Sequence, residues 1–191
     1  TLPRQKFSDC KPAMHEKRIL PAQFRRSEPP LTAWREYTNS SANGLVPIKV
    51  LNDWRRAAEA ADGISRPEFV AQTPRLLADD LHYEQRIATG ALATREGDAH
   101  DFFNALVWLR HPQLKWALNH RQCDDITTMG PKTRSRGQYA LTHFDEAGAI
   151  VWLADDVALA CWDAHDWEGL FRQHRDAWGT RIAVTVFGHA L

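Results

Sequence analysis

The clearest pattern of apolar and polar positions lies between residues 101 and 121. Apolar side chains recur there at every third or fourth position, which predicts an amphipathic helix. Asn104 lies within this run, and we expect it to be shielded from solvent. Pro112 lacks a backbone N–H and disfavours helix at the residue before it, so we expect two helical segments with a break near residues 110–111. The predicted buried face carries Phe102, Leu106 and Leu109.

Weaker patterns predict further helices, because runs of strong helix formers or apolar residues at helical spacing end at a glycine or begin at an aspartate. These helices are expected over residues 53–61, 76–88, 155–162 and 166–178. The polar stretch over residues 121–138 is predicted to be a loop.

Three apolar runs near the end of the chain are typical of strands. Two of them, residues 139–144 and 149–153, flank a short acidic turn that ends in glycine, which predicts a β-hairpin. Alternating β-branched residues over 181–187 predict another strand. The elements together predict an α+β fold, in which several helices pack on a small, mainly antiparallel sheet.

The first part of the chain differs from the rest. Residues 1–47 contain six prolines, and residues 1–35 carry eight basic and three acidic residues. Long regular elements are disfavoured by so many prolines. We therefore expect a single α+β domain over residues 48–191, preceded by an irregular, proline-rich, basic arm over residues 1–47. The aromatic residues expected to anchor the arm are Phe7, Phe24, Trp34 and Tyr37.

The composition indicates a folded chain, since 43% of its 191 residues are hydrophobic and eight are Trp. The 24 Lys and Arg residues balance the 24 Asp and Glu residues, but the charges are segregated. Residues 110–136 carry six basic and two acidic residues, whereas residues 145–171 carry seven acidic residues and no Lys or Arg. The balanced total therefore hides a dipolar surface.

Several classes of protein have no support in the sequence. The three cysteines have no CxxC spacing, so they indicate neither a zinc ribbon nor a disulfide framework, and a reducing cytoplasm is the simplest interpretation. No apolar run reaches the ~20 residues that a membrane helix needs. Gly-rich phosphate loops and HxxxH or HExxH motifs are also absent from the sequence. We therefore predict a cytoplasmic protein with no cofactor and no metal.

Residues 98–108 place a histidine, a carboxylate and an amide at the start of an apolar helix. His100 titrates near neutral pH and can act as acid or base when a carboxylate orients its second nitrogen. Arg95 and the free N–H groups of the helix start can hold a phosphate or carboxylate. This indicates a pocket for hydrolysis or group transfer on an anionic small molecule. The candidate catalytic residues are His100, Asp101, Asn104, Arg95, Glu84 and Asp145.

The same residues also have structural interpretations, so the sequence leaves open whether the protein is an enzyme. Asp101 can stabilise the start of the helix, and Asn104 can bridge to a neighbouring loop. A metal set of His100 and Asp101 with a distant His143 or His189 is conceivable, but the spacing of known metal motifs is missing.

A second function class is a non-catalytic module that binds nucleic acid or an acidic protein face through residues 110–136. Basic residues alternate there with Trp108 and Trp116, and nucleic-acid-binding surfaces combine positive charge with stacking rings. Pairing with the acidic turn near residue 145 of the same molecule is a structural alternative. Nucleic acid is the less favoured partner, and the oligomeric state is left open. The candidate residues are Lys115, Lys132, Arg134 and Arg136.

A series of motifs along the chain resembles a known family. It comprises Tyr83-Glu84-Gln85-Arg86-Ile87, Thr94-Arg95, the block from His100 to Trp108, Pro112, Lys115, Leu118-Asn119, Phe144-Asp145-Glu146 and Phe187-Gly188-His189-Ala190-Leu191. In this order the motifs resemble the bacterial family called domain of unknown function 3025, over about residues 51–191. The resemblance implies a bacterial cytoplasmic protein and supplies no activity.

Overall fold

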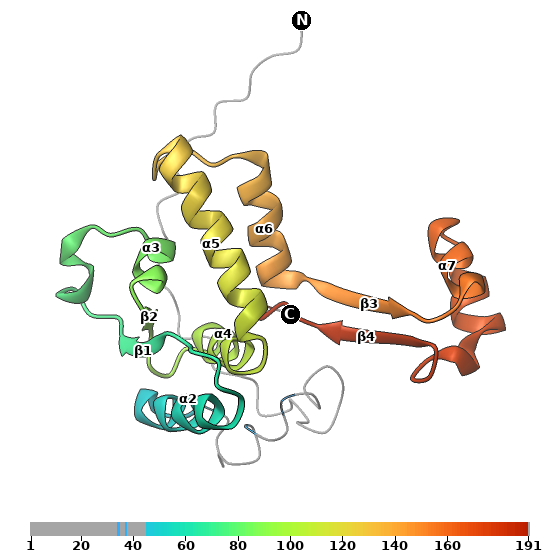
Figure 1. Ribbon diagram of the computed structural model, residues 1–191, viewed down its shortest axis with the longest axis horizontal. Coiled ribbons are helices and arrows are strands. Elements are labelled where there is room, and N and C mark those ends of the chain that lie inside the picture. Colours follow the sequence, from blue (N-terminus) through green and yellow to red (C-terminus); the bar gives the residue numbers. More distant parts are fainter. Residues whose placement is uncertain (1–33, 35–36, 38–44, 191) are drawn as a thin grey trace, which may run out of the picture.

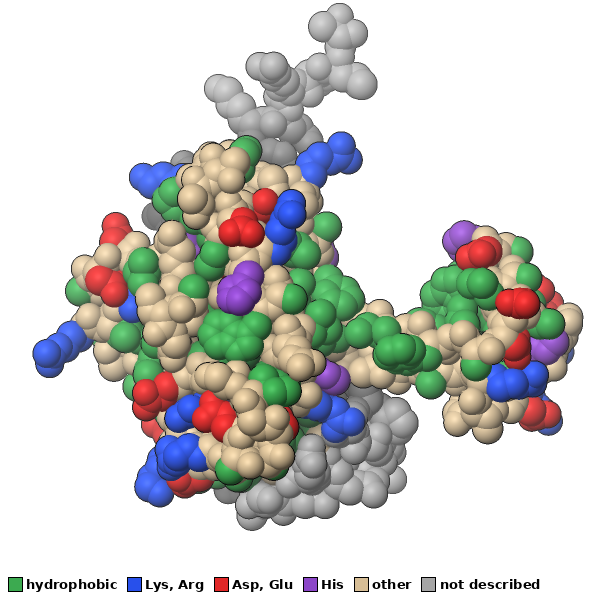
Figure 2. Space-filling model, in the orientation of Figure 1, with side chains coloured by type: hydrophobic (Ala, Val, Ile, Leu, Met, Phe, Trp, Pro, Cys, Tyr) green, Lys and Arg blue, Asp and Glu red, His purple; other side chains and the backbone are tan. Residues whose placement is uncertain are grey.

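The computed structural model describes Trp34, Tyr37 and residues 45–190, and it has two parts (Figure 1). Residues 45–148 and 187–190, together with Trp34 and Tyr37, form a mainly helical body. Residues 149–186 project from the body as a separate unit, which we call the distal module. The space-filling view shows a narrow connection between the two parts (Figure 2).

The body contains most of the helices and one parallel strand pair. In chain order its elements are α2 (Ile48–Asp62), β1 (Glu68–Ala71), the 3₁₀ turn η2 (Leu76–Asp79), α3 (Tyr83–Ala88), β2 (Ala91–Thr94), α4 (Ala99–Arg110), α5 (Pro112–Met129) and α6 (Arg136–Ala147). Strands β1 and β2 pair in parallel, with Phe69 opposite Leu92. Because α3 lies between them in the chain, this pair is a short strand–helix–strand crossover.

The distal module is built on an antiparallel ribbon. Its elements are β3 (Ala149–Leu153), α7 (Asp156–Asp163), the short helical turns η3 (Gly169–Gln173) and η4 (Arg175–Ala177), and β4 (Ile182–Val186). Strands β3 and β4 pair with Val151 opposite Val184. The α+β class predicted from the sequence is confirmed, but the strands form two separate pairs, one parallel and one antiparallel.

Each part has its own core. In the body, α4 is buried on almost every side, and Leu106 and Trp108 are at most 1% exposed. In the distal module the buried residues are Ala158, Leu170, Ala177 and Ile182. The expectation for α4 is confirmed, since Phe102, Leu106 and Leu109 are buried and Asn104 is only 6% exposed.

The predicted break at Pro112 is also confirmed. His111 has φ −125° and ψ 50°, outside the helical range, and Pro112 is the first residue of α5. Proline suits this position because the first residue of a helix needs no N–H donor. The last turn of α4 is held by the buried Arg66, whose Nε and Nη2 donate to the carbonyl of Leu109 at 3.1 and 2.8 Å.

Two predictions around α5 and α6 were wrong. Residues 121–129 continue α5, so the predicted loop shrinks to the turn before α6. Residues 139–144 belong to α6 and not to a hairpin strand, because Ser135 and Gln138 form a capping box that begins a helix. Strand β3 therefore pairs with β4, far along the chain, and not with the segment before it.

Two other predicted helices are shorter or less regular than expected. The stretch 76–88 splits into η2 and α3, because Asp80 adopts a left-handed conformation with φ 57°. The stretch 166–178 forms the π-helical turn η3 and the 3₁₀ turn η4. The sequence also gave no signal for β1 and β2, which have four residues each.

The predicted arm over residues 1–47 lies mostly outside the described residues. Of its proposed anchors, Trp34 is buried in the body core, and its ring meets that of His111 edge to face at 6.3 Å. Tyr37 packs on Trp54 with ring centroids 5.2 Å apart. Phe7 and Phe24 are not among the described residues. Within the described part of the chain, no helix is long and apolar enough to cross a membrane.

Candidate metal centre

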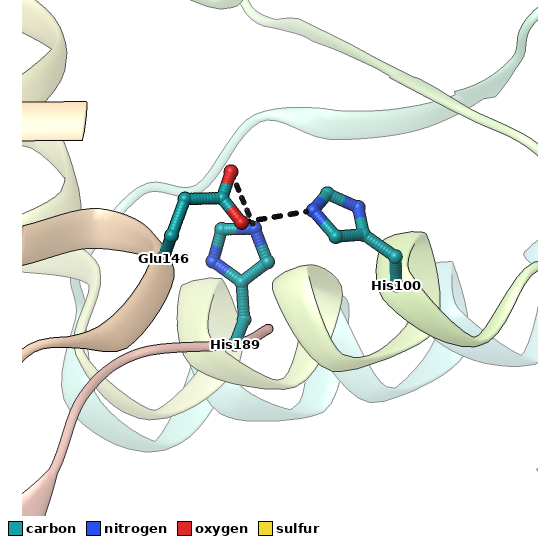
Figure 3. Close-up of side chains that lie close together, drawn as sticks. All are labelled: His100, Glu146 and His189. Carbon is teal, nitrogen blue, oxygen red and sulfur yellow. Dashed lines mark hydrogen bonds and ion pairs between the residues drawn. The ribbon is translucent and has the colours of Figure 1, made fainter. Parts of the chain in front are cut away.

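Two imidazole rings and one carboxylate meet where α4, α6 and the C-terminal segment come together (Figure 3). His100 Nε2 lies 3.3 Å from Glu146 Oε2, and His189 Nε2 lies 3.7 Å from Glu146 Oε1. The three side chains each offer one donor atom, and these atoms lie within 4.8 Å of one another. We call this group the His–Glu–His cluster. Two nitrogens and one carboxylate oxygen are a donor set that zinc and non-haem iron sites use.

Glu146 and His189 are brought together at the root of the projecting ribbon. Glu146 lies in the last turn of α6, and His189 follows β4. The N–H of Gly188 donates to the carbonyl of Gly148 at 2.8 Å, which ties the two ends of the ribbon together. A Cβ atom on Gly188 would lie 2.5 Å from the Cα atom of Ala147, so only glycine permits this approach. The fold of the ribbon therefore positions two of the three donor side chains.

The third donor, His100, is oriented by Asp101 in the first turn of α4 and by Arg95, which directly follows β2. Its Nδ1 lies 3.2 Å from Asp101 Oδ1. Arg95 holds the same carboxylate: its backbone N–H donates to Asp101 Oδ2 at 2.7 Å, and its guanidinium Nη2 donates to Asp101 Oδ1 at 2.7 Å. A carboxylate on one ring nitrogen orients the other nitrogen toward a metal in many metalloproteins. Here it leaves Nε2 directed at Glu146.

A second group of potential ligands, Asp98, His100 and Asp101, lies on the other side of the same ring. The negative charges of that group are already paired with a cation, because Arg95 Nη2 lies 3.4 Å from Asp98 Oδ1 and 2.7 Å from Asp101 Oδ1. Glu146 differs, since no Lys or Arg pairs with it among the described residues. Of the two groups, the His–Glu–His cluster is the one whose negative charge lacks a fixed cation.

The two histidines of the cluster differ in their ionisation. Burial and the nearby charge of Lys115 lower the pKa of His189 to about 4, so its ring is neutral at pH 7 and able to donate a lone pair. The hydrogen bond to Asp101 and the charge of Glu146 raise the pKa of His100. Hydrogen bonds from His100 and Arg95 outweigh burial and lower the pKa of Asp101, so this carboxylate is ionised. A metal therefore competes with a proton at His100.

Lys115 connects several of the other predicted site residues inside the body. Its ammonium group donates to Asn104 Oδ1 at 3.0 Å and to Asp145 Oδ1 at 2.6 Å, and its side chain is only 5% exposed. The same ammonium lies 5.4 Å from the centre of the Trp108 ring. Asn104 in turn donates to the hydroxyl of Tyr83 at 3.0 Å. These contacts bridge α3, α4, α5 and α6, so Asn104 and Asp145 have structural partners.

Glu84 lies on the far side of this network. Asn119 Nδ2 donates to its carboxylate at 2.7 Å and to its backbone carbonyl at 2.8 Å. Burial raises the pKa of Glu84, and the Asn119 hydrogen bond opposes this effect. Glu84, Lys115, Asn119 and Trp108 line a cavity of about 10 Å³, which is space for about one water molecule.

The His–Glu–His cluster is accessible from outside the body, because the side chains of His100 and Glu146 are each 38% exposed. The cavity beside Lys115 is lined by other residues and has space for about one water molecule. Trp108 Nε1 and Asn119 Oδ1 are buried without a partner among the described residues, and both residues line the cavity. Buried polar atoms of this kind are commonly satisfied by an internal water molecule.

The structure thus divides the six predicted catalytic residues into two groups. His100, Asp101 and Arg95 meet at the start of α4, while Asn104, Asp145 and Glu84 belong to the network around Lys115 and its cavity. Sequence reasoning missed Glu146. The sequence marked Glu146 only through the Phe144-Asp145-Glu146 motif, whose acidic residues are typical of a turn.

The basic residues proposed for nucleic-acid binding do not form one surface. Lys115 is buried, whereas Lys132, Arg134 and Arg136 are exposed around the turn between α5 and α6. The guanidinium of Arg134 lies 5.8 Å from the centre of the Tyr139 ring. Of the basic residues over 110–136, Arg110 and Arg121 are also exposed, so Lys115 is the one member of the strip that is buried.

Comparison with known proteins gives one result. The sequence model of a family described as "Protein of unknown function (DUF3025)" matches residues 67–191. The chain belongs to this family. No match to the chain was found among the curated proteins or among the solved structures. The matched range includes all three residues of the His–Glu–His cluster together with Asp101 and Arg95.

Proposed function

We propose that this member of the DUF3025 family binds a divalent transition metal at His100, Glu146 and His189 and uses it for hydrolysis or group transfer on an anionic substrate. One observation supports the proposal: three donor atoms from separate parts of the chain lie within 4.8 Å of one another. In addition, Asp101 contacts the other nitrogen of the His100 ring and is itself bound by Arg95. The sequence-based expectation of no metal rested on short motif spacing, which ligands so far apart in the chain cannot show.

The distances suit a metal of the size of zinc. Ligands 2.0–2.1 Å from a tetrahedral ion are about 3.3 Å apart. The two measured distances to Glu146, 3.3 and 3.7 Å, are close to this value. The distance between the two histidine donors, which is at most 4.8 Å, would shorten by rotation of the partly exposed His100. Three protein ligands leave a position for water or substrate, as in catalytic zinc sites.

The chemistry follows from that open position. A divalent ion held by His100, Glu146 and His189 would supply Lewis-acid activation of a water molecule at the open position. Attack of that water on an acyl or phosphoryl centre would release the leaving group, which would take the proton that the water loses. An anionic substrate is favoured because the ion carries two positive charges and the cluster supplies one negative charge.

Metal binding is tested directly on the full chain. The protein is stripped with a chelator, and zinc affinity is measured by competition with a chromogenic chelator. We expect one equivalent to bind, and His189→Ala and Glu146→Gln to weaken binding by more than the 10–100-fold that loss of an outer partner costs. His143→Ala is the matched control, because His143 is an exposed histidine on α6. Binding that persists in His189→Ala would refute the site.

The reaction is tested separately with chromogenic phosphate and carboxylate esters. The zinc-loaded protein is compared with the stripped protein and with Glu146→Gln. Turnover that needs both the metal and Glu146 supports the proposal, and turnover that survives chelation contradicts it.

A further inference from the structure

The ribbon that joins the distal module to the body lacks the usual sequence protection of strand edges. Strands β3 (AIVWL) and β4 (IAVTV) contain no charged residue and no proline. Natural proteins protect exposed strand edges with charges, prolines or bulges, and an isolated two-stranded ribbon is only marginally stable in water. Figure 2 shows hydrophobic side chains along this connection. The sequence of the ribbon is therefore typical of strands that pair with a further strand.

The strand register shows which backbone groups are available. The N–H of Phe187 donates to the carbonyl of Gly148 at 2.9 Å, and the N–H of Ala154 donates to that of Arg181 at 2.8 Å. Hydrogen-bonded pairs alternate along an antiparallel ladder, so Ala149 and Val151 direct their N–H and C=O groups away from β4. The opposite edge is partly closed, because Ile182 accepts from the N–H of Gly179 at 2.8 Å. Within residues 45–190, no backbone hydrogen bond closes the edge of β3.

We propose that β3 pairs with β3 of a second copy of this chain, antiparallel and centred on Val151, to form a four-stranded sheet. An isologous dimer places identical strands edge to edge about a twofold axis. Because β3 carries no charge, identical strands meet there without like-charge repulsion. Trp152, which is 61% exposed, gains a neighbour in Ile150 of the other copy.

Charge also selects the antiparallel direction. Asp155 and Asp156 follow β3 directly. Antiparallel pairing places these two acids of each copy at opposite ends of the shared sheet, whereas parallel pairing would bring all four together. A second copy is therefore the occupant that the edge favours.

The test is the oligomeric state of the full, metal-free chain, which keeps the result separate from the proposed metal function. Sedimentation equilibrium over a range of concentrations should show a reversible transition from 21.8 kDa to twice that mass. Val151→Lys places two ammonium groups opposite each other, and Val151→Pro removes two outward N–H donors. Each variant should raise the dimer dissociation constant by about tenfold or more.

Val184 is the cross-strand partner of Val151 on the other edge of the ribbon, but it is 46% exposed, whereas Val151 packs against the core of the distal module. Ala149→Pro is therefore a second test variant: Ala149 is exposed, it also directs its N–H away from β4, and its substitution should weaken the dimer as Val151→Pro does. Val184→Lys is the control for a charge on the ribbon. It should leave the dissociation constant within about threefold of the unchanged protein. Hydrogen exchange adds a local measurement: the amide of Val151 should become protected as concentration rises. A chain that stays monomeric at all concentrations overturns the proposal, and so does a dimer that Val151→Lys and Val151→Pro leave intact.

Discussion

The body and the distal module are both folded around apolar side chains, but they differ in how much they bury. Among the described residues, twelve form the buried core of the body, whereas four form that of the distal module. The buried polar residues among those described all lie in the body. Small cores supply little stability on their own, so the distal module should be the weaker unit. In the body, buried polar contacts such as those of Lys115 with Asn104 and Asp145 also fix the positions of side chains.

Two matched leucines test this difference. Leu106 in the body and Leu170 in the distal module are both fully buried. Leu106→Ala should lower the free energy of unfolding of the whole chain by about 2–5 kcal/mol. Leu170→Ala should instead unfold residues 149–186 alone, because the small module cannot absorb a loss of that size. Hydrogen exchange followed by mass spectrometry reports each region separately.

The protection of the two regions distinguishes independent from cooperative unfolding. If the two parts are independent, α4 and α5 keep their protection in Leu170→Ala while the distal module exchanges rapidly. Equal loss of protection in both parts would mean that the chain unfolds as one cooperative unit and that the distal module is not a separate, weaker unit.

The second prediction concerns the buried polar network of the body. Lys115→Met keeps the apolar stem but removes the ammonium that Asn104 and Asp145 share. Breaking a buried pair costs about 3–5 kcal/mol, and the 25% exposure of Asp145 should reduce this to about 2–3 kcal/mol. Lys132→Met, at an exposed position, should change stability by less than about 0.5 kcal/mol. Urea unfolding of the two variants measures the contrast, which equal losses would refute.

The third prediction concerns the residues behind His100 and rests on the proposed metal site. Asp101→Asn keeps the shape of the side chain but removes the charge that faces His100 and Arg95. Loss of such an outer partner should weaken zinc binding about 10–100-fold. The matched control is Asp98→Asn, because Asp98 contacts Arg95 and caps α4 and lies near the ring of His100, but the hydrogen bond to Nδ1 is made by Asp101. It should weaken binding less, and equal effects would remove the orienting role of Asp101.

The helices with strong local signals could be predicted from the sequence, whereas features set by distant contacts could not. Pro112 defined the break between α4 and α5, and the apolar face of α4 was correct. Residues 139–144 show the limit: their apolar run fits a strand as well as a helix, and the capping box of Ser135 and Gln138 decided for helix. The partner of β3 was missed because β4 lies beyond a whole helical module.

The residues of the candidate site also separate into those that local sequence predicts and those that depend on distant contacts. His100, Asp101 and Arg95 are close in sequence, and their clustering at the start of α4 followed from local pattern. Glu146 and His189 reach His100 only through the ribbon root, where Gly148 and Gly188 pack closely. The sequence could suggest His100 with His189 as conceivable ligands, but no spacing rule joins them to Glu146, so the complete set could not be recognised before the fold was known.

The smallest expected effect is an acid-sensitive contact at the edge of the body core. Hydrogen bonds from Arg66 and from the N–H of Ile64 lower the pKa of Asp62 from 3.8 to about 2. A carboxyl whose pKa is lowered by folding stabilises the protein above its unfolded pKa, and this contribution is lost as the pH falls through the folded value. The stability difference between the unchanged protein and Asp62→Asn should therefore be constant above about pH 5 and disappear between about pH 4 and 2. Because Asp62 is exposed, the difference should be small. Urea unfolding at a series of pH values measures it, and a difference that persists at pH 2 would show that Asp62 acts through its shape and not through its charge.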